Sequence, residues 1–210
     1  MFTAKPITPT VTGWLEVDLS DQIVEYLKKR IEFASASNRS IKFSLAGHIS
    51  ESLNLEDKDN YFYKNVLLPC ANTFIENFPW AYPKKVSSAD RTNLYLEKFW
   101  VNFQKKHEFN PLHTHSGIYS FVVWIKIPTN SEEQHSLPFL RDQNNPCASD
   151  FSISYIDTSG VIRNKYYPMD KSSEGKMLFF PSSLNHCVYP FYESDEERVS
   201  ISGNLFYGNL

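Results

Sequence analysis

The first half of the chain carries hydrophobic residues at helical spacing. Between residues 21 and 35, apolar side chains recur at every third or fourth position, and Ser20 precedes them as a candidate N-cap. The same rhythm returns over residues 59–78, where Pro69 is expected to kink the helix or to restart it. The pattern therefore predicts two amphipathic helices.

After residue 93 the pattern changes to short runs of β-forming residues separated by turn-forming residues. A hairpin is predicted around a turn at residues 158–160. Such a series of short strands is typical of two packed antiparallel sheets, so we expect a mainly β fold with supporting helices, a cupin-like jelly roll or double-stranded β-helix. The candidate strands are residues 94–103, 113–127, 150–157, 160–167, 176–181 and 197–207.

The length of 210 residues predicts a single domain, residues 1–210. Within it, residues 1–92 are expected to give helical support and irregular segments, and residues 93–210 the jelly-roll core. The 21 basic and 24 acidic side chains nearly balance, so the charge gives no sign of a nucleic-acid or anionic-membrane partner.

Three features predict a cytoplasmic protein. The N-terminus lacks the pattern of a secretory signal, and no stretch approaches the roughly 18 apolar residues of a membrane helix. Cys70, Cys147 and Cys187 are scattered and odd in number, which argues against a disulfide framework or a zinc ribbon and favours reduced thiols.

Two histidines separated by one residue, His113 and His115, stand at the start of the longest candidate strand. Side chains at positions i and i+2 of a strand point to the same face, so the two imidazoles are expected to converge. A third histidine, His186, follows the strand that ends at Pro181, in what should be the next turn. One histidine is more often an ordinary polar residue, but three in this order favour a metal site.

The last candidate strand places Arg198, Ser200 and Ser202 on one face. Such a row suits an exposed, solvated edge. It also suits a guanidinium group that holds a carboxylate through two parallel hydrogen bonds, with a hydroxyl beside it.

The segments NPLHTHSG, FPSSLNHCVYPFY and RVSISGN follow one another in an order that resembles the non-haem iron, 2-oxoglutarate-dependent oxygenases. The nearest resemblance is to a group of these enzymes found in bacteria and phages, and it covers residues 100–204. Several motifs in the correct order make the resemblance far more specific than any single one.

This resemblance implies Fe(II) as cofactor and 2-oxoglutarate as co-substrate. By the same resemblance, His113 and His186 are metal ligands, Arg198 anchors the far carboxylate of 2-oxoglutarate, Ser200 assists it, and Asn102 contacts the co-substrate.

The chain departs from the family pattern at His115, where a carboxylate is usual. Three imidazoles also suit zinc, which leaves the choice of metal open. Asp150, Asp157 or Glu108 are alternative sources of a carboxylate, but their spacing matches no family pattern, so His115 is the preferred third ligand.

The sequence therefore predicts an Fe(II)- and 2-oxoglutarate-dependent oxygenase, a hydroxylase acting in the cytoplasm, or in the host cytoplasm if a virus encodes it. Relatives act on protein residues, amino acids, nucleobases and small metabolites, and no residue selects among these substrates. One alternative is a three-histidine zinc hydrolase or lyase, which leaves Arg198 and Ser200 without a role. Another is a non-catalytic, cupin-like metal-binding or virion-associated module.

Overall fold

Ten strands form the body of the protein in a computed structural model, which describes residues 12–37, 39–79 and 94–208. They are β1 (Leu15–Asp18), β2 (Glu51–Asn54), β3 (Leu94–Gln104), β4 (Asn110–His113), β5 (Tyr119–Lys126), β6 (Phe151–Ile156), β7 (Ile162–Tyr167), β8 (Lys176–Pro181), β9 (Asn185–Val188) and β10 (Arg198–Tyr207).

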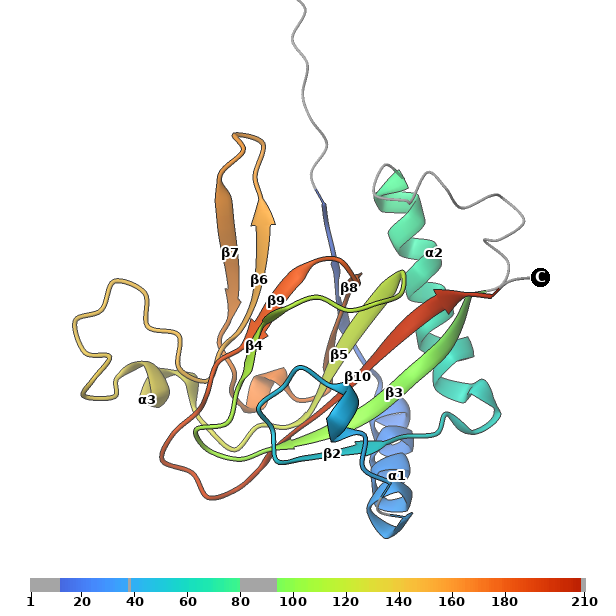
Figure 1. The fold of residues 1–210 in the computed structure, drawn as a ribbon, viewed down its shortest axis with the longest axis horizontal. Helices are drawn as coiled ribbons and strands as arrows, with labels where there is room; N and C mark the ends of the chain where they lie inside the picture. Colours follow the sequence, from blue (N-terminus) through green and yellow to red (C-terminus); the bar gives the residue numbers. More distant parts are fainter. Residues whose placement is uncertain (1–11, 38, 80–93, 209–210) are drawn as a thin grey trace, which may run out of the picture.

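These strands make two antiparallel sheets (Figure 1). The larger has the order β1-β8-β5-β10-β3-β2, and the smaller has the order β4-β9-β6-β7. The mainly β, jelly-roll architecture expected from the spacing of short strands is confirmed. A cluster of buried residues that includes Val122, Trp124, Phe151, Ile153 and Phe180 fills part of the space between the sheets.

The two predicted helices cover the outer face of the larger sheet (Figure 1). They are α1 (Asp21–Ser37) and α2 (Leu68–Asn77), and a π-helical turn (Tyr63–Leu67) leads into α2. Pro69 is therefore the second residue of α2. A proline has no N–H to donate, and its ring collides with the carbonyl four residues back in an α-helix. The π-helical turn before Pro69 is wider than an α-helical turn, and it lets the helix continue into α2.

The first half of the chain also gives the larger sheet two strands. β1 pairs with β8 and β2 pairs with β3, so this half is not purely helical and irregular. Two 3₁₀ turns (Lys42–Ser44 and Lys58–Asn60) lie in the same half. A third 3₁₀ turn (Lys171–Ser173) and the short helix α3 (Ser131–His135) lie in the second half of the chain. The predicted boundary between residues 92 and 93 lies outside the described residues, and the single domain stays a prediction.

Two expectations about the histidine segments were wrong. Residues 113–127 are not one strand, because β4 ends at His113 and β5 begins only at Tyr119. His186 does not lie in a turn, because it belongs to the short strand β9, which pairs with both β4 and β6. A four-residue strand buried between two others has too little sequence to show alternation.

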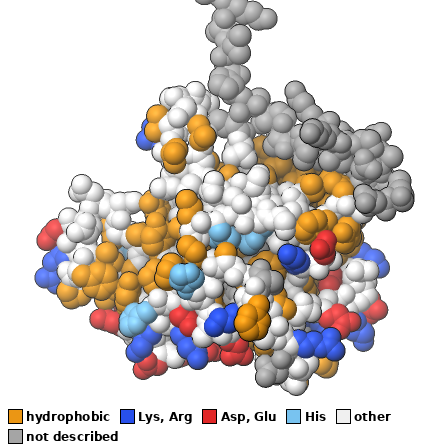
Figure 2. Space-filling view, in the orientation of Figure 1, with side chains coloured by type: hydrophobic (Ala, Val, Ile, Leu, Met, Phe, Trp, Pro, Cys, Tyr) orange, Lys and Arg blue, Asp and Glu red, His pale blue; other side chains and the backbone are white. Residues whose placement is uncertain are grey.

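Charges of both signs are mixed along the lower edge of the face seen in Figure 2. Opposite charges form ion pairs on the surface, such as Lys106–Asp195 and Lys126–Glu196, each at 2.7 Å. Within the part of the chain that the structure describes, no helix has both the length and the apolar character needed to cross a membrane.

Candidate active site

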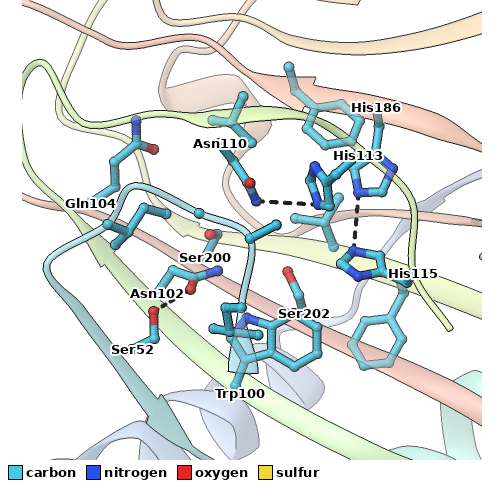
Figure 3. A pocket seen from close by; sticks show the side chains of 18 of the residues that line it. Ser52, Trp100, Asn102, Gln104, Asn110, His113, His115, His186, Ser200 and Ser202 are labelled. Carbon is cyan, nitrogen blue, oxygen red and sulfur yellow. Dashed lines mark hydrogen bonds between the residues drawn. The ribbon is translucent and has the colours of Figure 1, made fainter. Parts of the chain in front are cut away.

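Three imidazoles gather at one end of a cavity between the two sheets (Figure 3). His113 of β4 stands opposite His186 of β9 in register, and their ring centroids lie 4.2 Å apart. The ring of His115 lies 4.8 Å from that of His113 and 4.9 Å from that of His186. The ligand atoms that these residues offer all lie within 4.8 Å of one another, which is a spacing that one metal ion can span after small adjustments.

Backbone carbonyl groups orient two of these rings. Nδ1 of His113 lies 2.7 Å from the carbonyl oxygen of Pro111, and Nδ1 of His186 lies 2.9 Å from that of Leu184. Such bonds keep the proton on Nδ1 and leave the lone pair of Nε2 free, as in metal-bound histidines. Nε2 of His186 lies 3.2 Å from Nε2 of His115. Two nitrogens bound about 2.1 Å from one metal, at a right angle, would lie about 3 Å apart.

His115 reaches the cluster from a loop rather than from a strand. Its N–H donates to the carbonyl of Ser182, at 2.8 Å. Gly117 has φ +103°, and a Cβ there would lie 2.7 Å from the carbonyl oxygen of Leu205, so only glycine lets the loop turn this closely. The loop geometry, and not strand alternation, therefore brings His115 beside His113.

A buried hydrogen-bond network supports the same loop. The hydroxyl of Ser120 bonds the hydroxyl of Ser182 at 2.9 Å and the side-chain oxygen of Asn204 at 2.8 Å. These residues tie β5, the turn after β8, and β10 together, and Ser182 also accepts from the N–H of His115.

Burial keeps the three imidazoles neutral. Desolvation lowers the pKa of His113. Desolvation, with a smaller contribution from the neighbouring imidazoles, lowers the pKa of His115 to about 4 and that of His186 to about 3. Neutral imidazole is the form that binds a metal, so the site needs no deprotonation at neutral pH.

The metal-free protein is expected to lose stability as the pH falls from 7 to 5. The unfolded chain takes up protons on His115 and His186 below about pH 6.5, whereas the folded chain does so only near pH 4 and below. The difference lowers the free energy of unfolding by about 2 kcal/mol for each imidazole over this range. Denaturant titrations at the two pH values measure it. A His186→Gln variant should show a smaller loss, while the exposed His48→Gln control should match the wild type.

The wall of the cavity away from the imidazoles is polar. Ser200 of β10 stands opposite Asn102 of β3, and Ser52 of β2 donates to the side-chain oxygen of Asn102 at 2.7 Å. Gln104 extends this wall, as Figure 3 shows. The structure therefore brings the predicted Asn102 and Ser200 into the same cavity as the three histidines.

Arg198 lies two residues before Ser200 on β10, opposite Gln104, and does not line the cavity itself. It is only 1% exposed. Its Nη2 donates to the carbonyl of Ser149 at 2.7 Å and to the hydroxyl of the same residue, and the guanidinium lies 5.2 Å from the centre of the Phe191 ring. Nε and Nη1 have no hydrogen-bond partner among the described residues. A buried cation with two unused donors is costly unless an anion joins it.

Ser149 was missed by sequence reasoning. It is fully buried with φ 72°, an unusual backbone conformation for a serine, and its hydroxyl also bonds that of Thr129 at 2.9 Å. This strained residue fixes one end of the Arg198 guanidinium. A serine next to an aspartate in a loop carries no sequence signal for such a role.

The alternative carboxylates have other partners. Asp150 bonds Nε2 of His135 at 2.8 Å, Asp157 bonds Arg163 at the tip of the β6–β7 hairpin, and Glu108 accepts from the backbone of Ser50. In the described part of the chain, the only group of candidate metal ligands is His113, His115 and His186.

A comparison with protein families decides the assignment. The model of a family described as "Putative 2OG-Fe(II) oxygenase" matches residues 98–204, which is about half of the chain. The chain belongs to this 2OG-Fe(II) oxygenase family. The enzyme is therefore a 2-oxoglutarate-dependent dioxygenase, with Fe(II) as its metal and 2-oxoglutarate as its co-substrate, as the motifs predicted.

Solved structures agree with the fold of the oxygenase. A prolyl-4-hydroxylase from Pseudomonas putida matches with a TM-score of 0.51 at 15% identity, over 94% of both chains. A prolyl hydroxylase from Trichoplax adhaerens, in complex with a peptide of the hypoxia inducible factor oxygen degradation domain, matches with a TM-score of 0.50 at 12% identity. That match covers 93% of this chain and 83% of the other. No curated protein matches the chain in sequence.

The residues of the oxygenase fit both groups that the family uses. Three neutral imidazoles, two of them with Nδ1 bonded to a backbone carbonyl, suit a divalent transition metal. The buried guanidinium of Arg198, with two unused donors, suits a carboxylate near the inner end of the cavity.

Proposed function

We propose that His113, His115 and His186 bind the Fe(II) of this oxygenase. The observation that carries the proposal is the convergence of the three imidazoles at one end of the cavity. Three protein ligands leave three positions of a six-coordinate ion for small molecules. Because a neutral imidazole replaces the usual carboxylate at position 115, the net charge of the metal site is one unit more positive than in relatives with the carboxylate.

We propose further that Arg198 anchors 2-oxoglutarate, assisted by Ser200 and Asn102. Arg198, Ser200 and Ser202 lie on the same face of β10, which points between the sheets, so a molecule that reaches from the imidazoles along the Ser200–Asn102 wall ends beside Arg198. The unpaired Nε and Nη1 of that guanidinium support this role.

The reaction proposed is the hydroxylation of an unactivated C–H bond. Dioxygen is the oxidant: one of its atoms enters the C–H bond as the hydroxyl oxygen, and the other enters the succinate that forms as 2-oxoglutarate loses carbon dioxide. Fe(II), held by the three histidines, would supply the site at which dioxygen reacts. The chain itself orients the co-substrate through Arg198 and excludes water with apolar cavity residues such as Val122, Phe180 and Val188.

For the substrate, a protein residue is the first class to test, ahead of free amino acids and small metabolites. Two of the solved structures that resemble the chain are prolyl hydroxylases, and one of them was solved with a peptide. Proline-containing peptides are the first probes, and mass spectrometry would detect the gain of one oxygen atom.

The proposed location is the cytoplasm, or the host cytoplasm if a virus encodes the enzyme. Cys70, Cys147 and Cys187 are all free thiols, which supports a reducing compartment.

Anaerobic titration of the metal-free protein with Fe(II), and then with 2-oxoglutarate, tests the proposed sites. We expect a visible charge-transfer band that saturates at one Fe(II) per chain, because a keto acid chelated to Fe(II) absorbs there. His186→Ala should give no band, and the exposed His48→Ala control should give the full band. Tight zinc binding without any band would instead favour a three-histidine zinc hydrolase or lyase.

A further inference from the structure

Asn110 enters the cavity because of an irregularity in β4. Asn110 pairs with Val188 and His113 pairs with His186, so three steps along β4 match two steps along β9. This extra residue is a β-bulge, and bulges next to active sites re-aim side chains. Regular alternation would put residues 110 and 113 on opposite faces, but here both line the cavity (Figure 3).

The carboxamide of Asn110 lies at the edge of the imidazole cluster. Its Nδ2 is 3.4 Å from Nε2 of His113, the nitrogen that faces the cluster. Its Oδ1 is buried and has no hydrogen-bond partner within the described residues. The loop before β2 covers it, since a Cβ at Gly47 would lie 3.5 Å from Cγ of Asn110.

Metal binding would leave this amide with no protein partner at all. The lone pair of His113 Nε2 can serve Nδ2 of Asn110 or a metal, but not both. A buried polar atom without a partner, such as Oδ1 here, is unfavourable, so its place beside the metal calls for a ligand that it can bind.

We infer that Asn110 is a fourth residue of the metal centre, whose Oδ1 accepts a hydrogen bond from a water molecule bound to the metal. The inference rests on the proposed three-histidine site. Ionised 2-oxoglutarate offers only acceptors and cannot satisfy Oδ1, whereas water on a divalent metal is a strong donor. A carboxylate ligand has a second oxygen that can accept such a bond, and an imidazole bound through Nε2 has none. Asn110 supplies the acceptor that His115 lacks.

Two substitutions separate this role from a structural one. Asn110→Leu keeps the volume and removes the acceptor, while Asn110→Asp keeps an oxygen in place. Affinity for Fe(II) alone is measured anaerobically by competition with a chelator, without 2-oxoglutarate. We expect Asn110→Leu to weaken it by about 10- to 100-fold, the usual effect of removing a group that supports a metal centre. Asn110→Asp should keep or strengthen it.

The metal-free variants give the second readout. Because Oδ1 has no partner without metal, Asn110→Leu should melt no lower than the wild type, whereas a structural asparagine would leave a less stable protein. Asn164→Leu, on the exposed strand β7 of the same sheet, is the matched control and should not change Fe(II) affinity.

Three results would overturn the inference. They are unchanged Fe(II) affinity in Asn110→Leu, a lower melting temperature of the metal-free variant, or a loss of affinity for 2-oxoglutarate with Fe(II) binding intact. The last would mean that Nδ2 donates to the co-substrate. A failure of the three-histidine site itself would look different, because His186→Ala would then bind Fe(II) like the wild type.

Discussion

Replacing His186 with alanine is expected to abolish the stabilisation of the fold by Fe(II). His186 is buried, and its Nε2 lies 3.2 Å from that of His115, so its loss leaves two protein ligands and an open side. A ligand at 100 times its Kd stabilises the folded state by about 2.7 kcal/mol, which is a rise of roughly 5–10 °C in Tm for a chain of this size. Thermal melts of each protein with and without anaerobic Fe(II) measure the difference.

The comparison within each variant removes the effect of the substitution on the metal-free fold. His135→Ala is a useful control, because that imidazole bonds Asp150 away from the cluster. If the His186→Ala protein gained the full stabilisation from Fe(II), His186 would not be a ligand, and the metal would have to bind elsewhere on the chain.

Replacing Arg198 is expected to weaken 2-oxoglutarate binding strongly while leaving Fe(II) binding nearly unchanged. Removing one partner of a buried charge pair costs about 2–5 kcal/mol, which is about thirtyfold to several-thousandfold in affinity. Arg198→Met is the preferred variant, since it fills the space without the charge. Arg198→Lys should also bind poorly, because an ammonium group cannot present several fixed donors to a carboxylate. The charge-transfer band measures the Kd for 2-oxoglutarate.

Stability provides the control for this prediction. Arg198→Met loses the two bonds of Nη2 to Ser149, but it also removes a buried charge whose Nε and Nη1 have no partner within the described residues, so we expect only a small change in stability in the absence of co-substrate. Wild-type affinity for 2-oxoglutarate in Arg198→Met would assign the anchor to another cation. Lys42 lines the cavity from the loop before β2, whereas Lys126 is paired with Glu196 at the surface and is a poorer candidate.

Helices and turns that depend on the local sequence pattern could be predicted from the sequence. The helix at Asp21–Ser37 and the restart at Pro69 follow from apolar spacing and from the chemistry of proline. The β6–β7 hairpin follows from its turn, where Gly160 has φ 79° and the N–H of Asp157 bonds the carbonyl of Val161. Strands β1, β2 and β9 have four residues each, so the pairing of distant segments, and not their own sequence, defines them.

The sequence by itself determined which residue types are available to the oxygenase for catalysis, because the order of three histidines and an arginine can be recognised without the structure. Only the tertiary structure decided how they meet. His113 and His186 face each other through strand register, but His115 comes from a loop that Gly117 and Ser182 shape. Asn110 turns inward through a bulge, and Ser149 reaches Arg198 from a separate strand's loop. Each of these contacts depends on backbone irregularity and on partners far along the chain, which a periodic pattern does not record.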